Sequence, residues 1–404
     1  MSSTLGTSHS NSPAAAGSID WGNVRDQFPV TQRWSWFNSA TYGPLPACNI
    51  EAQTSFLRET STGATVPGVG HWWEGADVVR QKIGQLVNAS PQDICFLKST
   101  SEGLGLAVTG LDWSPGDEVI TYDQEFFSVV YPWLGLGDKG VNVRFVRDRG
   151  RFRFDVDDVA ELIGPRTRLI CLSLVNFSTG FRAPLEAISR LCRQHGIWLV
   201  VDAVQAVGCL SVDVQSLGAD LVAAHGYKAL CAGYGIAFCY VAPRFRQALN
   251  VPVPGWKSVE DVLDLTDLTY HPDYDLVLAH DARRFESGVQ NLAGIYGMGA
   301  SVDLFLGLGV DAINDHVLSI SALVTKTVES CGYHVVSSSA AGERSGIVSF
   351  ECPGDDPERV VAALQESGVV CAAREGRIRV SSHLFVGEKD VERLGAMLVR
   401  ARRG

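Results

Sequence analysis

Lys228 has the neighbours that a catalytic lysine requires. It follows an apolar run at residues 219–224, and Asp202 directly follows an earlier apolar run at residues 197–201. A lysine in a turn is usually a solvated surface residue, but these two side chains complement each other chemically. The amine can form a Schiff base with an aldehyde, and the acid can pair with a pyridinium nitrogen. The pattern therefore predicts pyridoxal 5′-phosphate as the cofactor, with Lys228 as the catalytic residue.

The composition limits the size, partners and location of the protein. The 404 residues are 46% hydrophobic, which is enough to bury a large core and to form two domains. The net charge of -11 argues against nucleic acid as a partner. No apolar run in the sequence approaches the roughly 20 residues that span a membrane. Residues 1–18 lack the charged start and apolar centre of a signal peptide, so we expect a flexible tail.

The cysteines point to a reducing compartment. There are 10 of them, no two have the C-x-x-C spacing, and several lie inside apolar runs. We interpret them as reduced, mostly buried side chains of a cytoplasmic protein. The sequence predicts neither a disulfide framework nor a metal site.

Apolar runs alternate with helical patterns through the middle of the chain. This alternation predicts an α/β domain whose mostly parallel sheet is covered on both faces. Ligands of such sheets lie at the carboxyl ends of the strands, where Asp202 is placed. The last hundred residues change to a strand–helix–strand–helix pattern, which predicts a small α+β domain. The expected divisions are a tail at 1–18, an N-terminal segment packing with the small domain at 19–50, a large cofactor domain at 51–299 and a small domain at 300–404.

Several spaced segments carry a resemblance to a known family. They are residues 96–111, 123–133, 173–184, 283–301 and 374–394, in addition to the segment around Lys228. Together they resemble the class V, fold-type I pyridoxal phosphate enzymes. This group includes cysteine desulfurases, isopenicillin N epimerase-like proteins, kynureninases and C–S lyases of specialised metabolism. The resemblance implies an α/β fold with a mostly parallel seven-stranded sheet in the large domain and a small C-terminal α+β domain.

The resemblance also implies which residues bind the cofactor. Asp202 would hold the pyridinium nitrogen, and Phe126 would stack on the ring where desulfurases have a histidine. The phosphate would be bound at a helix N-terminus and by nearby side chains. The residues expected to contact the cofactor are Thr100, Ser101, His225 and Tyr227 at the phosphate, and Asn176 and Gln205 at the phenolic oxygen. Gly288 and Val289 would reach the phosphate of the neighbouring subunit of a homodimer, although Val289 replaces the usual threonine.

Other segments would bind the amino-acid substrate. Arg379 would clamp its α-carboxylate through a bidentate pair. In relatives a stretch near the N-terminus lines the pocket, which here contains Asn38, Ala40, Thr41 and Tyr42. Less is implied for His71, Trp72 and Trp73, which could line the pocket or the dimer interface or serve in packing. Trp256 could form part of a gate.

Several reactions are open to an enzyme of this kind. The span before Arg379 is shorter than the loop that carries the persulfide-forming cysteine of desulfurases, and Cys371 has an apolar context typical of a core residue. We therefore favour a C–S β-lyase that acts on an S-substituted cysteine in specialised metabolism, including antibiotic biosynthesis. Alternatives are decarboxylation-coupled oxidative deamination, transamination and epimerisation. A non-enzymatic cofactor-binding protein is a further alternative, against which the combination of Asp202, Gln205, Lys228 and Arg379 argues.

Overall fold

A seven-stranded sheet forms the centre of the computed structural model, which describes residues 19–63, 70–260 and 276–402. The predicted tail at residues 1–18 lies outside the described residues. The strand order is β2-β8-β7-β6-β5-β3-β4, and the pairs from β7 to β4 are all parallel. β8 is antiparallel to both of its neighbours. The strands are β2 (Ile94–Leu97), β3 (Glu118–Tyr122), β4 (Asn142–Val146), β5 (Thr167–Ser173), β6 (Trp198–Asp202), β7 (Leu221–His225) and β8 (Ala237–Val241).

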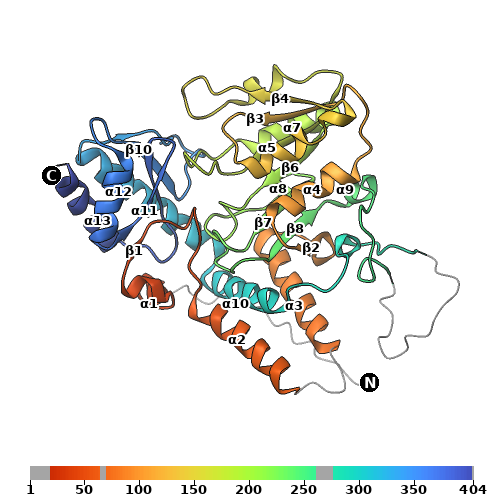
Figure 1. Cartoon of the computed structure of the whole chain (residues 1–404), viewed down its shortest axis with the longest axis horizontal. Helices are drawn as coiled ribbons and strands as arrows, with labels where there is room; N and C mark the ends of the chain where they lie inside the picture. Colours follow the sequence, from red (N-terminus) through yellow and green to blue (C-terminus); the bar gives the residue numbers. More distant parts are fainter. Residues whose placement is uncertain (1–18, 64–69, 261–275, 403–404) are drawn as a thin grey trace, which may run out of the picture.

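Helices cover this sheet, which confirms the predicted α/β class. The apolar runs become central strands because side chains on both faces of the sheet are buried. β8 follows Lys228 after a turn, so this lysine lies in the connection between two strands. The helices around the sheet are α2 (Ala47–Thr62), α3 (Gly70–Val87), α4 (Thr100–Gly110), α5 (Phe127–Leu134), α6 (Val156–Ala160), α7 (Leu185–His195), α8 (Val214–Leu217), α9 (Pro243–Ala248) and α10 (Leu292–Leu308). Figure 1 shows α10 beside α2 and α3, against which it packs.

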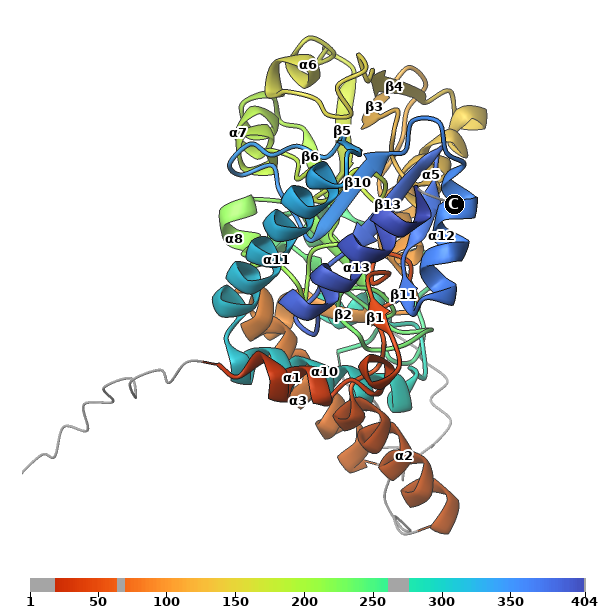
Figure 2. The ribbon, with the colours of Figure 1, turned by 90° about the vertical axis from the view of Figure 1, so that its left-hand side faces the viewer.

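A four-stranded antiparallel sheet follows in the last hundred residues. Its order is β12-β13-β10-β9. Helices pack against this sheet, and Figure 2 shows them beside β10 and β13. The strands are β9 (His334–Val335), β10 (Ile347–Glu351), β12 (Ala372–Arg374) and β13 (Arg377–Ser381), and the helices are α11 (Val310–Ser330), α12 (Pro357–Glu366) and α13 (Glu388–Ala401). The predicted strand–helix–strand–helix pattern therefore forms as an α+β unit.

The start of the described chain contacts this C-terminal unit. α1 (Trp21–Asp26) precedes the short strand β1 (Ser35–Trp36), which pairs in parallel with β11 (Val369–Val370). A single bridge then joins Asn38 to Ser381 at the end of β13. The proposed divisions at residues 50 and 299 remain predictions, and α10 continues across the second of them.

Short helices complete the described elements. They are 3-10 turns η1 (Pro29–Gln32), η2 (Pro91–Asp93), η3 (Gly137–Lys139) and η4 (Ala282–Phe285). Among the described residues, no single helix has the length and apolarity needed to cross a bilayer. α10 and α11 meet that criterion only as a pair, with a bend of 83° between them.

Candidate functional site

Three polar residues end neighbouring strands at one edge of the large sheet. Ser173 ends β5, Asp202 ends β6 and His225 ends β7. Ser173 lies opposite Asp202 in the parallel register, and Asp202 lies opposite Ala223 on β7. The carboxyl ends of parallel strands are where α/β sheets bind ligands. The fold therefore places these candidate residues together at the carboxyl ends of the strands, as predicted for Asp202.

Lys228 lies in the turn after β7 and is only 6% exposed. Its Nζ is 5.2 Å from the centre of the Phe126 ring and 5.4 Å from that of Tyr227. Burial lowers the pKa of the Lys228 amine to about 8, while the Asp202 charge acts in the opposite direction. Desolvation disfavours the charged form of a buried lysine. A large fraction of Lys228 is thus a neutral amine near pH 8, as a nucleophile and proton acceptor must be.

The Lys228 backbone is closely packed against the N-terminal segment. The Gly43 N–H donates to the carbonyl oxygen of Tyr227 at 2.8 Å. A β-carbon on Gly43 would lie 2.0 Å from the carbonyl oxygen of Lys228. Only glycine permits this approach, which the sequence pattern did not reveal.

Asp202 is a buried acid that forms no ion pair within 4 Å among the described residues. Its Oδ1 accepts a hydrogen bond from the Val204 N–H at 2.9 Å. Burial raises the pKa of the Asp202 carboxyl to about 6, against the opposing effects of this hydrogen bond and of Lys228. A cation placed against this carboxyl would restore its charged form. The protonated nitrogen of a pyridine ring is such a cation.

The first turn of α4 lies beside the end of β7. Thr100 begins the helix, and its Oγ1 accepts a hydrogen bond from the backbone N–H of His225 at 3.1 Å. The Ser101 hydroxyl lies 2.9 Å from that of Ser128, a residue not predicted for the site. A helix N-terminus with added hydroxyl groups is suited to bind a phosphate.

The His225 imidazole faces the same region without a partner. Its buried Nε2 has no hydrogen bond to the described residues. Burial, with a smaller contribution from the charge of Lys228, lowers the pKa of His225 to about 4. The ring packs edge-on against Tyr227 with 4.4 Å between ring centres. A phosphate could accept a hydrogen bond from this imidazole.

The aromatic side chains frame the lysine. Phe126 directly precedes α5, and its ring meets that of Phe177 edge-on at 5.3 Å. Tyr227 stacks on Tyr234 with 5.1 Å between ring centres. The structure therefore brings the two predicted rings, Phe126 and Tyr227, next to Lys228.

Other protein groups partly occupy the amides of Asn176 and Gln205, whose contact with the cofactor stays a prediction. The Asn176 Oδ1 accepts from the N–H groups of Ser178 and Thr179, and its Nδ2 donates to the carbonyl of Gln124 at 2.8 Å. The Gln205 Nε2 donates to the carbonyl of Ala40 at 3.0 Å. Each side-chain NH₂ has two hydrogens. One hydrogen therefore remains on each amide for an external acceptor.

Arg379 is a buried arginine on β13 and is 2% exposed. Its Nη1 donates to the carbonyl of Phe177 at 2.5 Å, and its Nη2 donates to Thr41 Oγ1 at 2.7 Å. Its Nε has no partner in the described residues, where no carboxylate forms an ion pair with it either. Burial, with a smaller contribution from the charge of Arg374, lowers the pKa of Arg379 to about 10. A carboxylate ligand would satisfy this buried cation.

The segment at residues 38–42 lies between β13 and Lys228. The Ala40 N–H donates to Ser381 Oγ at 2.9 Å, and the buried Oδ1 of Asn38 has no partner in the described residues. The Tyr42 ring packs edge-on against Trp36 and is 38% exposed. Ala40 contacts Gln205 and Thr41 contacts Arg379, so both help to position residues of the site. Asn38 retains a buried acceptor without a partner in the described residues.

Gly288 and Val289 lie apart from this cluster in the protomer. Val289 is 71% exposed, and neither residue forms a hydrogen bond with Lys228 among the described contacts. Gly288 lies near the indole nitrogen of Trp256. The expected contact with a neighbouring subunit stays a prediction.

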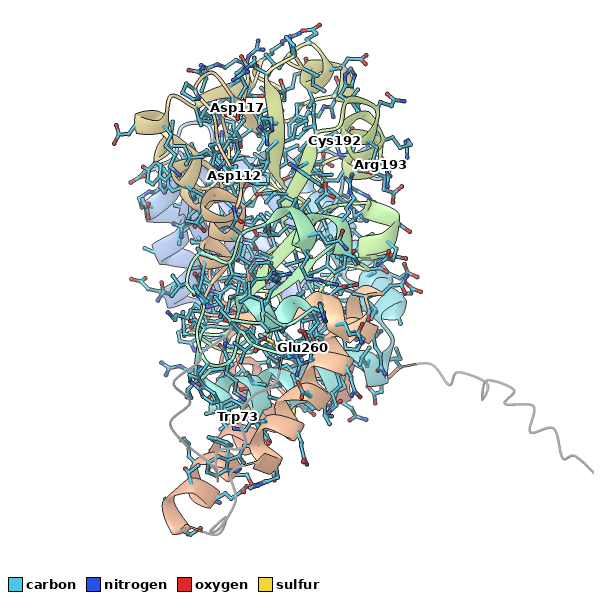
Figure 3. The ribbon with its side chains drawn as sticks, turned by 90° about the vertical axis from the view of Figure 1, so that its right-hand side faces the viewer. Trp73, Asp112, Asp117, Cys192, Arg193 and Glu260 are labelled. Carbon is cyan, nitrogen blue, oxygen red and sulfur yellow. The ribbon has the colours of Figure 1, made fainter. Side chains whose placement is uncertain are left out.

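The histidine and tryptophans of α3 make local contacts. His71 and Trp72 both hydrogen-bond to Glu59 Oε1, at 2.7 and 2.9 Å. Figure 3 places Trp73 on α3, toward the end of the molecule opposite Asp117. The Lys257 Nζ lies 3.7 Å from the centre of the Trp73 ring and 4.8 Å from that of Trp256. These contacts favour packing over a direct role in the site.

Glu125 is a buried acid that sequence reasoning missed. Its carboxylate accepts from the N–H of Ser173 at 2.7 Å and from the Ser173 hydroxyl at 2.5 Å. Burial raises the pKa of Glu125 to about 7, against the opposing effect of the Ser173 hydrogen bonds and with a smaller contribution from the charge of Asp202. Two adjacent buried carboxyls are unfavourable when both are ionised. Glu125 directly precedes Phe126, and that adjacency was the one available signal in the sequence.

Cys371 lies between β11 and β12 and is buried. Burial raises the pKa of its thiol to about 12. A thiol in this state is a poor nucleophile because the thiolate is the reactive form.

Cys371→Ser should leave most of the turnover intact. The thiol is buried and its pKa is raised, which makes it a poor nucleophile, and serine is close to cysteine in size. Steady-state kinetics of the purified variant, together with its melting temperature, checks this expectation. Collapse of turnover at an unchanged melting temperature would identify Cys371 as a catalytic nucleophile.

The described residues fit pyridoxal phosphate at each end. The unpartnered Nε2 of His225 and the first turn of α4 suit the phosphate, and the underpaired acid Asp202 suits the ring nitrogen. Lys228 lies between them with its amine beside the Phe126 ring.

Comparisons with known proteins identify the family of the chain. The aminotransferase class-V family model matches residues 36–394. A probable cysteine desulfurase of Methanothermobacter thermautotrophicus is 27% identical over 399 residues, which cover 93% of this chain and 96% of the relative.

Solved structures share the fold. The cystine C–S lyase C-DES, in complex with its product cysteine persulfide, is 24% identical and has a TM-score of 0.84, with 92% of this chain and 99% of that chain covered. A mutant of C-DES with glycine covalently linked to its PLP cofactor has the same identity of 24% and TM-score of 0.84, with 93% and 98% covered.

Proposed function

Since the chain belongs to the aminotransferase class V family, we propose that it is a C–S β-lyase that acts on an S-substituted cysteine. Its cofactor is pyridoxal 5′-phosphate. When bound, this cofactor supplies an electron-accepting ring that stabilises negative charge at Cα of an amino acid. The observation that carries the proposal is a buried amine, Lys228, in the turn after β7, together with a buried cation, Arg379, that forms no ion pair with a carboxylate among the described residues.

Each residue is assigned one task in this proposal. Asp202 holds the ring nitrogen in its protonated form. Thr100, Ser101 and His225 hold the phosphate, with Ser128 as an additional donor. Phe126 packs on the face of the ring. Arg379, kept in place by Thr41 and Phe177, binds the α-carboxylate of the substrate through its two nitrogens.

Lys228 moves the proton. With a pKa of about 8, its amine is neutral often enough to accept the proton from Cα. The electron pair of the Cα–H bond then forms the Cα–Cβ double bond, and the Cβ–S bond breaks to release a thiolate. Addition of water to the product gives pyruvate and ammonia, so one S-substituted cysteine and one water yield one thiol, one pyruvate and one ammonium ion.

The cysteines favour elimination over desulfuration. Cys48 and Cys331 are half-buried, and all the others are buried. A desulfurase needs an accessible thiolate to accept sulfur, whereas a lyase releases the thiol directly. A cystine C–S lyase and a probable cysteine desulfurase are among the similar proteins, which supports this substrate class. We place the reaction in specialised metabolism and in the cytoplasm.

Product stoichiometry tests the proposal. The purified enzyme with its cofactor is incubated with a panel of S-alkyl cysteines, and thiol, pyruvate, ammonia and carbon dioxide are measured. Equal amounts of thiol, pyruvate and ammonia, without carbon dioxide, are expected. Carbon dioxide release would replace the proposal with oxidative decarboxylation, and release of alanine would replace it with desulfuration.

We also infer a homodimer with the active sites near the interface. Val289, next to Gly288, is 71% exposed, and Tyr234 beside Tyr227 is 69% exposed. Exposed large apolar side chains are a feature of protein interfaces. Light scattering should give about twice the 43.6 kDa of one chain. A stable monomer with full activity would contradict the inference.

A further inference from the structure

The two residues that flank Lys228 are held by distant parts of the chain. The carbonyl of Tyr227 accepts a hydrogen bond from the Gly43 N–H at 2.8 Å. On the other side, the carbonyl of Ala229 accepts one from Nε2 of His383 at 2.8 Å. Gly43 belongs to the N-terminal segment, whereas His383 follows β13 in the C-terminal unit. Of these two donors only His383 is a side chain, so its contact can be removed by substitution without changing the backbone.

The same turn contains strained backbone, which needs such support. Cys231 has a φ of 48°, in the left-handed region that residues other than glycine rarely adopt. A conformation of this kind persists where the surrounding structure fixes it. The Cys231 N–H donates to the Lys228 carbonyl at 3.0 Å, and the Cys231 carbonyl accepts from the Ser301 hydroxyl at 2.9 Å. The shape of the turn thus depends in part on contacts from outside it.

Both ring nitrogens of His383 have defined partners. The Leu384 N–H, which can only donate, lies 2.9 Å from Nδ1, so Nδ1 is the acceptor. The Ala229 carbonyl can only accept, so Nε2 carries the hydrogen. The imidazole is fully buried and stacks on the Phe385 ring with 5.1 Å between ring centres and 7° between the planes. Burial lowers the pKa of His383 to about 4, so the ring is neutral and keeps this tautomer near neutral pH.

His383 lies four residues after Arg379, on the segment that continues from β13. This strand ends at Ser381, whose N–H donates to the Phe37 carbonyl at 2.8 Å. One segment of the C-terminal unit therefore contacts the turn of Lys228 through His383 and also carries Arg379, the residue assigned to the substrate carboxylate. A fixed spacing between these two parts matters because proton transfer requires the amine to be aligned with Cα of the bound substrate.

We propose that His383 is a positioning residue for Lys228, whose turn it holds through the Ala229 carbonyl so that the amine is aimed at Cα of a substrate bound on Arg379. The inference rests on the proposed function only in the assignment of Arg379, because any reaction that uses Lys228 needs the same alignment. Without this donor, a carbonyl of the buried Ala229 would lose its hydrogen bond beside the catalytic lysine, and the turn would relax. The effect should fall on turnover more than on substrate binding, because Arg379 keeps its own contacts.

Two substitutions separate the hydrogen bond from the packing of the ring. His383→Phe keeps an aromatic ring of similar shape and removes the donor, whereas His383→Gln keeps an N–H donor. With S-methylcysteine as the substrate, His383→Phe should lower kcat by about tenfold and change KM by less than about twofold. His383→Gln should recover most of the lost turnover.

Visible circular dichroism of the bound cofactor gives a readout that does not depend on turnover. The signal, divided by the absorbance at the same wavelength, reports the orientation in which Lys228 holds the cofactor. This ratio should change in His383→Phe and return toward the wild-type value in His383→Gln. If S-methylcysteine is not cleaved but the ratio follows this pattern, the lyase proposal fails and the His383 inference stands.

His316→Phe is a matched control. Nε2 of His316, on α11, also contacts a backbone carbonyl, that of Val386 at 2.9 Å, but this hydrogen bond does not involve the turn of Lys228. The control should lower the melting temperature without changing kcat or the dichroism ratio. If His383→Phe does not fold, His383→Leu, which is smaller and also lacks a donor, takes its place. A wild-type kcat and ratio in the folded variant without a donor, the same changes in His316→Phe, or no recovery in His383→Gln would overturn the inference.

Discussion

Replacing Lys228 with alanine should lower kcat/KM for C–S cleavage by about a thousandfold or more. The variant loses both the amine that attaches the cofactor and the group that accepts the Cα proton. Lys228 is 6% exposed, and no other lysine contacts Phe126 or Tyr227 among the described residues. Steady-state kinetics with cofactor in excess, and the absorption spectrum of the purified protein, measure the two losses separately.

Lys257→Ala is a matched control for this prediction. Burial also lowers the pKa of Lys257, but its amine lies against Trp73 and Trp256 rather than at the sheet edge. This variant should keep the covalently bound cofactor. A Lys228→Ala enzyme with near wild-type turnover would show that the proton acceptor lies elsewhere.

Arg379→Ala should weaken the binding of substrates that carry a free α-carboxylate. The loss of a bidentate, charge-assisted pair costs on the order of 2–4 kcal/mol, or roughly thirty- to a thousandfold in kcat/KM. The side chain is buried between Phe177 and Thr41, so its fork is already held in one orientation before a ligand arrives. Little conformational entropy is then lost on binding.

Cofactor binding should survive this substitution. The groups assigned to the phosphate, Thr100, Ser101 and His225, lie at the opposite end of the site, on α4 and β7. Titration with amino acid, followed by the cofactor absorbance, tests both parts. Unchanged affinity for the amino acid would remove Arg379 from the substrate site, and loss of the cofactor would mean that Arg379 serves the cofactor instead.

Much of the fold could be predicted from local patterns. The run before Asp202 is apolar at every position, and it becomes β6 at the centre of the sheet because both of its faces are buried. The position of Asp202 at a carboxyl end followed directly. Lys228 could be identified as a candidate from its chemical type and its distance from the preceding strand alone.

Long-range contacts could not be predicted from such patterns. Arg379 and Thr41 are 338 residues apart, and their hydrogen bond depends on the parallel pairing of β1 with β11. The prediction for Asn176 did not anticipate that its oxygen would fix the turn at Ser178 and Thr179. Glu125 was missed because a buried acid is recognised by the groups that surround it, here Ser173 on another strand.

Borohydride reduction of the purified protein, followed by peptide mapping, tests the central claim most directly. Reduction fixes the cofactor to the nitrogen that carries it. The account predicts a single pyridoxyl group on the peptide that contains Lys228, and none on that peptide in Lys228→Ala. A label on another lysine, or no label after pyridoxal phosphate is supplied, would contradict the account.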